Sequence, residues 1–513
     1  MLTKSKIKEI LSNRIEELSS SKLPHFLLLS DIKKASERIV TAINRGEKIA
    51  VVGDYDADGV CSSAIMNLFF KKLGVDVEVV IPDRFEHGYG LSVKLLNQIE
   101  ADLIITVDNG ITSFESAKEC EKRGIDLIIT DHHTPLITEN EEIFKLPDAY
   151  AVVNPKTSLD FPFKEICGAE VAWYLCAAVK AELKAEIDLR EFTDILCIAI
   201  VADVMPLTHM NRTLVNMGLK RLNRGEKPFS KALKRFFNKE FKSEDIAFQI
   251  APRINSAGRM ANAITAYRFF ISETEQEAYS YLMELDSYNN ERKEVEKNAL
   301  ESIEVGDEDF IVIKGDYHEG VVGIIASRLV HRYKKPAIVF CEEDGKLKGS
   351  GRSLGNIDIF SLVSECADLL EGFGGHKMAC GMKLKSENFE ELKKTLNKKI
   401  EKYSKDDFFI EDYVLGYLPF SEIDLELLDI LDAYEPYGES NPKPKFISSA
   451  KIEHIQNLKE NHFKLILSQD DILLPGVVFR YDGEFEEHIE FKFSVSENTY
   501  YGRSVQLIIE EIL

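Results

Sequence analysis

The run VVGDYDADGV places three carboxylates in alternation, at Asp54, Asp56 and Asp58, with Gly59 directly behind them. A D-x-D-x-D-G run opens an EF-hand calcium loop, and three clustered carboxylates can also serve catalysis. The calcium loop needs a bidentate Glu at its twelfth position, where this chain has Ile65, and the AVVG before the run has strand character. The run therefore predicts a catalytic carboxylate cluster rather than an EF-hand.

Three further acidic residues end apolar runs: Asp108 ends ITVD, Asp131 ends LIITD, and Asp203 ends ILCIAIVAD. His132 and His133 follow Asp131 directly. Each position alone is explained by a helix cap or a surface turn, although an aspartate in a buried stretch is costly unless paired or bound to metal. Carboxylates with one or two imidazoles suit Mn²⁺ or Mg²⁺ better than Zn²⁺. Two such ions clamping one phosphate are a recurrent way to hydrolyse phosphoesters.

The elements that must position these groups are short, strongly apolar runs. KIAVVGD, VEVVIPD, ADLIITVD, IDLIITD and AYAVVN are rich in Val and Ile on both faces, as strands of a covered parallel sheet are. Helix-like segments separate them, for example residues 62–73 and 112–123. The alternation predicts a doubly wound α/β domain. Because ligands bind beyond the carboxyl ends of parallel strands, we expect the acidic residues to share one rim of the sheet.

The remainder of the chain changes character in steps. Residues 167–270 read as mostly helical, and the charged, Pro- and Gly-free segment 272–304 reads as one long solvated helix joining two lobes. A second α/β pattern runs from residue 309 to about residue 401. After residue 406, the proline-rich EPYGESNPKPKF precedes short alternating strands such as HFKLILS and FKFSVS, which predict a small β-barrel or sandwich.

Length and composition indicate a protein of several domains. The chain has 513 residues, more than the roughly 250–300 that one core usually spans. Its eight cysteines form no C-x-x-C pair, and its longest apolar run is far short of the roughly 20 residues of a membrane span. No secretory signal is visible at the N-terminus. We therefore expect a cytoplasmic protein with reduced thiols and no membrane contact.

The formal net charge of −23 argues against a general nucleic-acid binder, which is usually basic. Two considerations limit that argument. Bound cations offset the charge of acidic ligands, and a nucleic-acid groove needs only local positive charge.

Motifs in a fixed order resemble those of a known family. GDYDADG, VDNG, DHH and VADVMPL resemble the successive motifs of the DHH phosphoesterase superfamily, and GVVGIIASRL, GSGRS and GFGGHKMACGM resemble its DHHA1 partner domain. Within this superfamily, the chain resembles the bacterial exonucleases that are specific for single-stranded DNA. Three features carry this closer resemblance: PRINSAGRM, the long helix and EPYGESNPKPKF.

This resemblance implies an α/β fold in which a DHH parallel-sheet lobe and a DHHA1 α/β lobe are joined by a long helix, followed by a C-terminal OB-fold β-barrel. The implied parts are a DHH catalytic domain, its helical extension, a connecting helix, a DHHA1 domain and an OB-fold domain, at residues 1–215, 216–271, 272–305, 306–402 and 406–513.

By resemblance, the site holds two ions, Mn²⁺ or Mg²⁺. Asp56 would hold one ion and Asp58 the other, and Asp108 would bridge both. His132 and Asp203 would complete the second site. The ion pair would lower the pKa of a bound water, and the resulting hydroxide would attack phosphorus in line without a covalent intermediate.

Three positions surround these ligands. Asp54 would be a ligand or a supporting group, Asp131 would orient His132, and His133 would face the scissile phosphate. The family often carries a His near the start of the first motif, where this chain reads VV. The ligand set of the first ion therefore stays open.

The second lobe would hold the end of the substrate. The resemblance implies that Ser350 and Arg352, with Arg84 of PDRFEHGYG, bind the 5′ phosphate of the strand. The glycines around Gly351 let backbone N–H groups approach a phosphate, and the arginine fork suits phosphate oxygens.

Further substrate contacts are implied on both lobes. Gly375 lies in a second flexible glycine stretch, and His376 would contact the nucleotide near the metals. Arg253 and Arg259 of PRINSAGRM are candidate contacts to the DNA backbone. Taken alone, glycine pairs mostly mark turns and surface arginines mostly face solvent.

The resemblance implies a monomeric 5′-to-3′ exonuclease that hydrolyses single-stranded DNA to 5′-mononucleotides in DNA repair and recombination, working with a helicase and a single-strand-binding protein. Three alternatives stay open. A DHH phosphodiesterase of short oligonucleotides or cyclic dinucleotides usually lacks the long helix and the barrel. A non-catalytic DNA-binding replication scaffold of the same fold would have eroded carboxylates. A manganese pyrophosphatase has no need for a barrel.

Residue types leave the role of the C-terminal barrel undecided. An OB-fold offers stacking aromatics and a basic groove, but residues 447–513 hold 6 Lys and Arg against 12 Asp and Glu. The barrel either binds DNA, or shapes the channel and docks a protein partner. The candidate aromatics are Phe463, Phe479, Tyr481, Phe491, Tyr500 and Tyr501.

Overall fold

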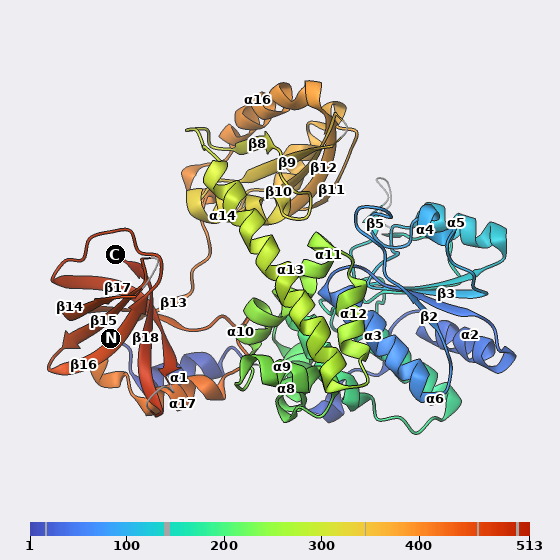
Figure 1. Cartoon of the computed structure of the whole chain (residues 1–513), viewed down its shortest axis with the longest axis horizontal. Helices are drawn as coiled ribbons and strands as arrows, with labels where there is room; N and C mark the ends of the chain where they lie inside the picture. Colours follow the sequence, from blue (N-terminus) through green and yellow to red (C-terminus); the bar gives the residue numbers. More distant parts are fainter. Residues whose placement is uncertain (16–17, 138–143, 344, 459–460, 499–501) are drawn as a thin grey trace.

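Two α/β lobes and a β-barrel surround a central group of helices (Figure 1). This computed structural model describes residues 1–15, 18–137, 144–343, 345–458, 461–498 and 502–513. Within these residues, no helix combines the length and apolar character needed to cross a membrane. All eight cysteines are buried thiols that form no disulfide within the described residues, as their apolar surroundings predicted.

The first lobe is built on a parallel sheet of five strands in the order β2-β1-β3-β4-β7. The predicted strands are confirmed, at Ile49–Val52 (β1), Glu78–Val80 (β2), Leu103–Val107 (β3), Asp126–Thr130 (β4) and Ala151–Val153 (β7). Side chains alternate between two cores, which is why the strands are apolar on both faces. A small hairpin, Leu136–Ile137 (β5) with Phe144–Lys145 (β6), lies outside the sheet.

Helices cover both faces of this sheet. Val51 and Ile105 pack in one core with α2 (Ile32–Arg45), α3 (Ala57–Lys72) and α6 (Gly168–Leu183). Ala50 and Ile104 pack on the opposite face, with α4 (Val93–Leu96) and α5 (Phe114–Arg123).

The central helices extend the first of these cores. They are α7 (Thr193–Ala202), α8 (His209–Arg224), α9 (Pro228–Phe237), α10 (Ser243–Asp245), a π-helical turn (Ile246–Ile250), α11 (Ala251–Met260) and α12 (Ile264–Ile271). The predicted connecting helix is present as α13 (Glu275–Ser302). It is not solvated all round, because Ala278, Leu282 and Leu285 are buried in the core that it shares with α9, α11 and α12.

The second lobe contains a mixed sheet in the order β11-β12-β10-β9-β8, in which only β8 and β9 run parallel. Its elements are β8 (Ile311–Gly315), α14 (Val322–Tyr333), β9 (Ala337–Glu343), β10 (Lys346–Arg352), α15 (Ile359–Ser364), β11 (Gly372–His376), β12 (Ala379–Lys385) and α16 (Phe389–Lys399). The two glycine stretches predicted to be flexible are strands β10 and β11, so they are neither turns nor loops.

The C-terminal body is a closed five-stranded barrel, as predicted. Its strands follow the order β14-β15-β16-β18-β17, and β17 pairs back with β14. They are β14 (Lys445–Asn457), β15 (Phe463–Gln469), β16 (Ile472–Val478), β17 (His488–Asn498) and β18 (Ser504–Ile512), with β13 (Val414–Tyr417) added beside β14 and α17 (Leu425–Ala433) packed on the outside.

The barrel core also contains the first helix of the chain, α1 (Lys4–Ser12). Ile7 and Leu11 are fully buried there. The backbone N–H of Lys4 donates to the Glu422 carboxylate at 2.8 Å, across 418 residues of sequence. The expected DHH boundary at residue 1 remains a prediction, but this first helix packs with the barrel.

The candidate stacking aromatics of the barrel divide by burial. Phe491 is fully buried, and Phe463 and Tyr481 pack against the same core. Phe479 is 54% exposed and available to a ligand. Tyr500 and Tyr501 lie outside the described residues.

Candidate metal centre

The three alternating aspartates lie at the junction between β1 and α3. Asp56 is the N-cap of α3, and its Oδ1 accepts hydrogen bonds from the N–H groups of Asp58 (3.0 Å) and Gly59 (3.1 Å). Asp54 lies in the turn before this cap, and Asp58 lies in the first helical turn. A strand, a turn and a helix N-terminus place all three carboxylates at the rim of the sheet, which is not the geometry of an EF-hand loop.

Asp108 follows β3 with a left-handed backbone, φ 63°. That conformation is uncommon outside glycine, and such positions cluster at functional sites. Asn109, which sequence reasoning missed, fixes the turn: its amide donates to the carbonyls of Val52 (3.0 Å) and Val107 (2.9 Å), and its Oδ1 accepts from the N–H of Leu91 (3.1 Å).

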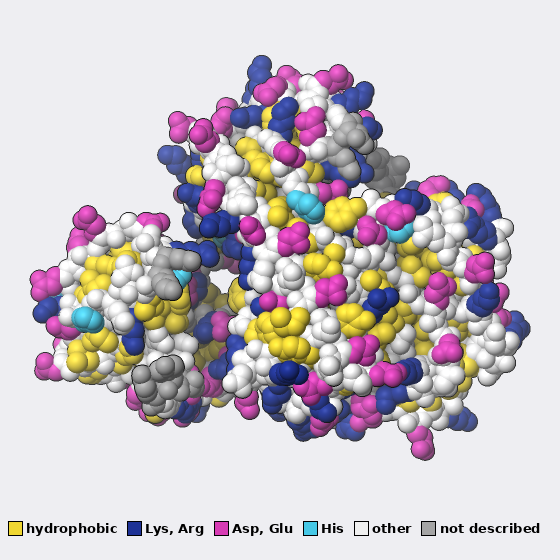
Figure 2. All heavy atoms as spheres, viewed as in Figure 1, with side chains coloured by type: hydrophobic (Ala, Val, Ile, Leu, Met, Phe, Trp, Pro, Cys, Tyr) yellow, Lys and Arg dark blue, Asp and Glu magenta, His cyan; other side chains and the backbone are white. Residues whose placement is uncertain are grey.

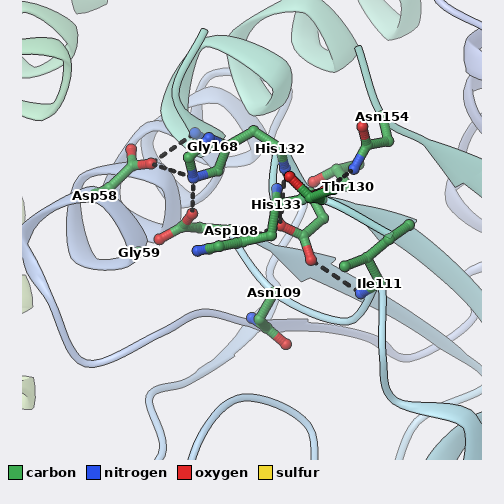
Figure 3. A network of polar contacts seen from close by, with 12 residues as sticks. Asp58, Gly59, Asp108, Asn109, Ile111, Thr130, His132, His133, Asn154 and Gly168 are labelled. Atoms are coloured by element: carbon green, nitrogen blue, oxygen red, sulfur yellow. Dashed lines mark hydrogen bonds and ion pairs between the residues drawn. The ribbon is translucent and has the colours of Figure 1, made fainter. Parts of the chain in front are cut away.

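The structure brings the predicted ligands together. His132 Nε2 lies 3.3 Å from Asp108 Oδ1, 3.5 Å from Asp203 Oδ2 and 3.8 Å from Asp58 Oδ2. Asp58 and Asp108 meet His132 beside the N-terminus of α6 (Figure 3).

The candidate ligand atoms fall into overlapping groups whose members all lie within 4.8 Å of one another. One group is Asp54, Asp56 and Asp108. The others are Asp58, His132 and Asp203, and Asp108, His132 and His133. Asp108 belongs to both the first and the third group, and its bridging role stays a prediction.

Buried, unpaired atoms converge on this centre. Among the residues that the structure describes, four atoms of this centre are buried without a hydrogen-bond partner: Asp54 Oδ1, Asp108 Oδ1, His132 Nε2 and Asp203 Oδ2. Burial, and then the neighbouring carboxylates, raise the pKa of Asp54, Asp108 and Asp203 well above the usual value. Burial also lowers the pKa of His132 to about 3, so the imidazole is neutral and able to bind a metal. Divalent cations would satisfy these atoms, and the oxygen-rich donor set fits Mn²⁺ or Mg²⁺.

Asp131 differs from the other carboxylates because its oxygens are fully hydrogen-bonded. Oδ1 accepts from the N–H of His132 (2.7 Å), the N–H of His133 (3.0 Å) and His133 Nδ1 (2.7 Å), and Oδ2 accepts from the N–H of Ile111 (2.9 Å). The expectation that Asp131 orients the His132 ring is corrected here, because the ring that it holds is that of His133. The ring of His132 bonds instead to the backbone of Ile166.

The Asp131–His133 pair is ionised. Burial alone would lower the pKa of His133, but the hydrogen bond to Asp131 and the negative charges of Asp131, Asp203 and Asp56 together outweigh burial and raise this pKa to about 9. Burial is also the largest single effect on Asp131, but the hydrogen bonds from His133 and the positive charge of His133 act together against it, so the pKa of Asp131 is lowered. His133 is therefore a cation at neutral pH and can face a negatively charged phosphate.

The N-terminus of α6 holds Asp58, a role that sequence reasoning missed. The N–H groups of Gly168 (2.6 Å) and Ala169 (2.9 Å) donate to its two carboxylate oxygens. Glu170 closes a capping box by accepting from the N–H of Cys167 at 2.9 Å. Burial and the nearby Asp56 nevertheless outweigh these bonds and raise the pKa of Asp58 to about 6.

This pKa predicts how pH affects the metal-free protein. Unfolded aspartate titrates near 4, so between about pH 4 and pH 6 the folded state keeps the Asp58 proton that the unfolded state loses, and stability falls as the pH rises. The expected loss in the free energy of unfolding is on the order of 3 kcal/mol. The raised pKa values of Asp54, Asp108 and Asp203 extend this loss of stability to higher pH. Melting temperatures at pH 5, 6 and 7, in EDTA and in saturating Mn²⁺, measure it. Mn²⁺ should remove the fall, and equal slopes in both buffers would contradict the metal assignment.

A second cluster, of arginines, forms between the two lobes. Arg259 Nη1 donates to the carbonyl of Gly320 at 3.0 Å and so joins α11 to the second lobe. Burial lowers its pKa to about 10, and the nearby charges of Arg84 and Arg352 add to this effect. The Arg84 guanidinium lies 4.3 Å from the centre of the Tyr55 ring. Like charges held this close favour a bound anion.

Ser350 and Arg352 lie together on β10. Arg352 Nη1 donates to Ser350 Oγ (3.0 Å) and to the carbonyl of Gly351 (2.8 Å). The first turn of α14 adjoins them, since a Cβ added to Gly323 would lie 3.0 Å from both Arg352 Nη2 and Ser350 Oγ. A guanidinium, a hydroxyl and a helix N-terminus together form a phosphate-binding arrangement.

The structure does not bring every predicted residue into these clusters. Arg253 is paired with Asp286 at 2.7 Å and lies over the rings of Phe236 and Phe237. Gly351 is inside a strand, where a Cβ would lie 2.8 Å from Cys380 Sγ and from a methyl of Ile359, so packing accounts for its small size.

Gly375 and His376 lie on the exposed edge strand β11. One aromatic that sequence reasoning missed lies at the centre: the Tyr89 hydroxyl donates to the carbonyl of Asp108 (3.2 Å) and lies 3.3 Å from His133 Nδ1. Tyr89 belongs to the same PDRFEHGYG run as Arg84, and that proximity was the available signal.

This fold and site define a protein of the DHH class with a DHHA1 domain. The chain matches the DHH family N-terminal domain over residues 48–200, the DHHA1 domain over 307–402 and the RecJ OB domain over 416–511.

Curated relatives narrow the class. The chain is 33% identical to the single-stranded-DNA-specific exonuclease RecJ of Salmonella typhimurium, over 94% of this chain and 90% of the relative. It is 37% identical to RecJ of Bacillus subtilis over 90% of this chain, but it spans only 60% of that longer relative. The crystal structure of Thermus thermophilus RecJ in complex with Mn²⁺ superposes with a TM-score of 0.82 at 30% identity, covering 94% of this chain and 72% of that one. The chain belongs to the RecJ family.

Proposed function

We propose that the protein is a 5′-to-3′ exonuclease that hydrolyses single-stranded DNA to 5′-mononucleotides with two Mn²⁺ or Mg²⁺ ions. The observation that carries the proposal is the pairing of two buried clusters: a carboxylate–imidazole centre that shares Asp108, and the arginines between the lobes. The names of the relatives support the substrate, and the RecJ structures with Mn²⁺ and with Mg²⁺ support the ions.

The residues have distinct tasks in this proposal. Asp54, Asp56 and Asp108 hold one ion. Asp58, His132 and Asp203 hold the other, with Asp108 shared. When bound, such an ion pair supplies an activated water and neutralises charge on the scissile phosphate. His133, kept cationic by Asp131, lies beside Asp108 and places a further positive charge next to that phosphate.

Arginines set the direction of attack. Arg84, Arg259 and Arg352, with the Ser350 hydroxyl, bind the terminal 5′ phosphate, because a guanidinium presents a fork of donors to phosphate oxygens. With this phosphate held between the lobes, the next phosphodiester lies at the metal centre. Arg253, Gly351, Gly375 and His376 remain predicted substrate contacts.

Two features favour this function over its alternatives. The long helix α13 and the barrel are both present, and a phosphodiesterase of short oligonucleotides or cyclic dinucleotides, like a manganese pyrophosphatase, needs neither. A replication scaffold would not need the intact ligand groups.

We further propose that the protein acts as a cytoplasmic monomer in DNA repair and recombination, on strands supplied by a helicase and a single-strand-binding protein. Eight buried cysteines kept as reduced thiols support a reducing compartment. The domain boundaries proposed are those expected from the sequence, with α1 as an added part of the barrel domain.

One assay tests the activity, its direction and the phosphate pocket. Oligonucleotides labelled at either end, single-stranded or duplex, with a 5′ phosphate or a 5′ hydroxyl, are digested with Mn²⁺ or with EDTA. Release of mononucleotides from the 5′ end of single strands, only with metal, is expected. Arg352→Ala should slow digestion of the 5′-phosphorylated strand by roughly 10- to 150-fold, with a smaller effect on the 5′-hydroxyl strand.

Arg190→Ala, at an exposed position of the first lobe, is the matched control. Attack from the 3′ end would contradict the proposed function, and equal losses on both 5′ ends would remove Arg352 from the phosphate pocket.

A further inference from the structure

The EPYGESNPKPKF segment is fixed onto the catalytic lobe. Arg212 of α8 donates to the carbonyls of Tyr434, Glu435 and Pro436. Ser243 Oγ donates to the carbonyl of Tyr437 (2.6 Å). The N–H of Leu207 donates to the carbonyl of Glu439 (2.8 Å). The segment that leads to the barrel therefore forms a rigid wall against the end of α7 and the start of α11.

A cavity of about 440 Å³ lies inside this wall. Its lining is mostly apolar and includes Val201, Val204, Met205, Phe248, Pro252 and Tyr437. Its lining also includes Glu244 of α10, and Figure 1 shows α10 on the side of the central helices that faces the barrel. Figure 2 shows an open notch between the barrel and the second lobe. The cavity volume is enough for a small organic group such as a nucleobase.

The cavity shares a wall with the metal centre. Ala202 and Val204, which line it, flank the proposed ligand Asp203 in sequence. Asn255, which also lines it, accepts a hydrogen bond through Oδ1 from the N–H of Ala57, the residue between Asp56 and Asp58. A group bound in the cavity would therefore lie next to the reacting phosphate.

Two backbone irregularities present apolar side chains to this cavity. Val204 has φ 55°, a strained conformation for a β-branched residue, and is 62% exposed. Phe248 lies in the π-helical turn, where the N–H of Ala251 bonds to the carbonyl of Ile246, and it is 76% exposed. π-Helical turns frequently occur at functional sites. Neither exposed side chain is accounted for by packing alone.

We infer that this cavity binds a nucleobase of the DNA strand on the 3′ side of the scissile bond. The inference rests on the proposed function. The charged rim disfavours a phosphate, because Glu244 is already paired with Lys443 (2.7 Å) and Glu439 adds a negative charge. A neutral, flat group fits apolar walls and an exposed aromatic ring, and stacking on that ring needs no particular sequence. The 5′ phosphate pocket lies toward the second lobe and this cavity toward the barrel, so the base belongs to the 3′ portion of the strand.

Abasic substitution tests the inference. The substrates are a series of single-stranded, 5′-phosphorylated oligo-dT strands, each with one abasic residue at a different position from the 5′ end. For each strand, KM is measured with Mn²⁺, and the equilibrium affinity is measured in EDTA by fluorescence anisotropy. In the wild type, one position near the 5′ end should weaken binding by roughly 5- to 150-fold, the effect of losing one stacked base. Phe248→Ala should weaken binding of intact oligo-dT by a similar factor. In this variant, an abasic residue at that position should cause no further loss of affinity.

The exposure of Phe248 means that its replacement leaves the core intact, and a melting temperature checks this. Leu159→Ala, at a 94% exposed apolar position of the same lobe, should keep the wild-type abasic profile. If the wild type degrades single strands from the 5′ end but Phe248→Ala has the same profile, only this inference is overturned. If the wild type neither binds nor degrades single strands, the proposed function and the inference are both overturned.

Discussion

Asp108→Asn is expected to lower the rate of DNA degradation by at least ~10³-fold and, at the same time, to raise the melting temperature of the metal-free protein. The rate falls because Asp108 is the carboxylate shared between ligand groups, and removing several kcal/mol of transition-state stabilisation costs this factor. The metal-free protein gains stability because burial and the neighbouring Asp58 disfavour the ionised carboxylate. Asn keeps the shape and tolerates the left-handed φ of 63°.

Digestion rates in Mn²⁺ and melting temperatures in EDTA measure the two effects, and each kcal/mol of relieved repulsion should add roughly 2–4 °C. Mn²⁺ should raise the melting temperature of the wild type more than that of the variant. Asp160→Asn, at an exposed position, is the matched control and should change neither quantity. A variant that is both inactive and less stable in EDTA would indicate a structural carboxylate instead of a metal ligand.

Gly168→Ala is expected to lower activity by about 10²-fold and the free energy of unfolding by about 1–3 kcal/mol. A Cβ on Gly168 would lie 2.5 Å from Asp108 Cβ and Oδ1 and 2.8 Å from its Cα. The backbone of the Asp108 turn has no room to move, since Asn109 ties it to two strands. The start of α6 must shift instead, which weakens the bond from the N–H of Gly168 to Asp58.

The affinity for Mn²⁺, from calorimetric titration of the metal-free variant, separates this explanation from a general loss of stability. Gly372→Ala is the matched control, because a Cβ there meets nothing within 4 Å. Unchanged Mn²⁺ affinity in Gly168→Ala would show that α6 does not position the ligands.

The metal centre could be predicted because short sequence patterns mark the positions of its acidic residues. Asp54, Asp108 and Asp131 all follow apolar strands, and parallel strands bring their carboxyl ends to one rim. Asp203 could be predicted as a ligand because a charge that is buried at the end of an apolar helix is costly unless it is paired or bound to metal. Each of these signals can be read within a few residues of the site.

The supporting contacts could not be predicted, because they join residues far apart in sequence. Asp58 and Gly168 are 110 residues apart, and no local pattern marks a glycine whose N–H serves a distant carboxylate. Tyr89 lies between β2 and α4, and it reaches the centre because the N–H of Leu91 bonds to Asn109 in the turn after β3. Asp131 holds the ring of His133 where the ring of His132 was expected, and the backbone partner of His132, Ile166, belongs to a later segment.

The sequence did not predict the backbone conformation of the motif glycines or the contacts of the motif arginines. Gly351 and Gly375 belong to glycine-rich stretches of the kind that usually form turns. Both lie in strands, where glycine allows close packing of neighbouring layers. Arg253 and Arg259 lie in one motif, yet α11 directs Arg253 to Asp286 and Arg259 to the second lobe. Residue type alone does not distinguish a guanidinium that is engaged within the protein from one that is available to a ligand.

The docking of α1 in the barrel has a consequence for how the chain is made. The partner of Lys4 emerges 418 residues later, which at 5–20 residues per second is on the order of 20–80 s of synthesis. During that interval Ile7 and Leu11 have no barrel core to enter, and their apolar surface stays open to chaperones and to other nascent chains. The parallel sheet and the metal centre can form well before this time. Helix α1 therefore leaves the ribosome long before the barrel does, yet it is among the last parts of the protein to reach its native position.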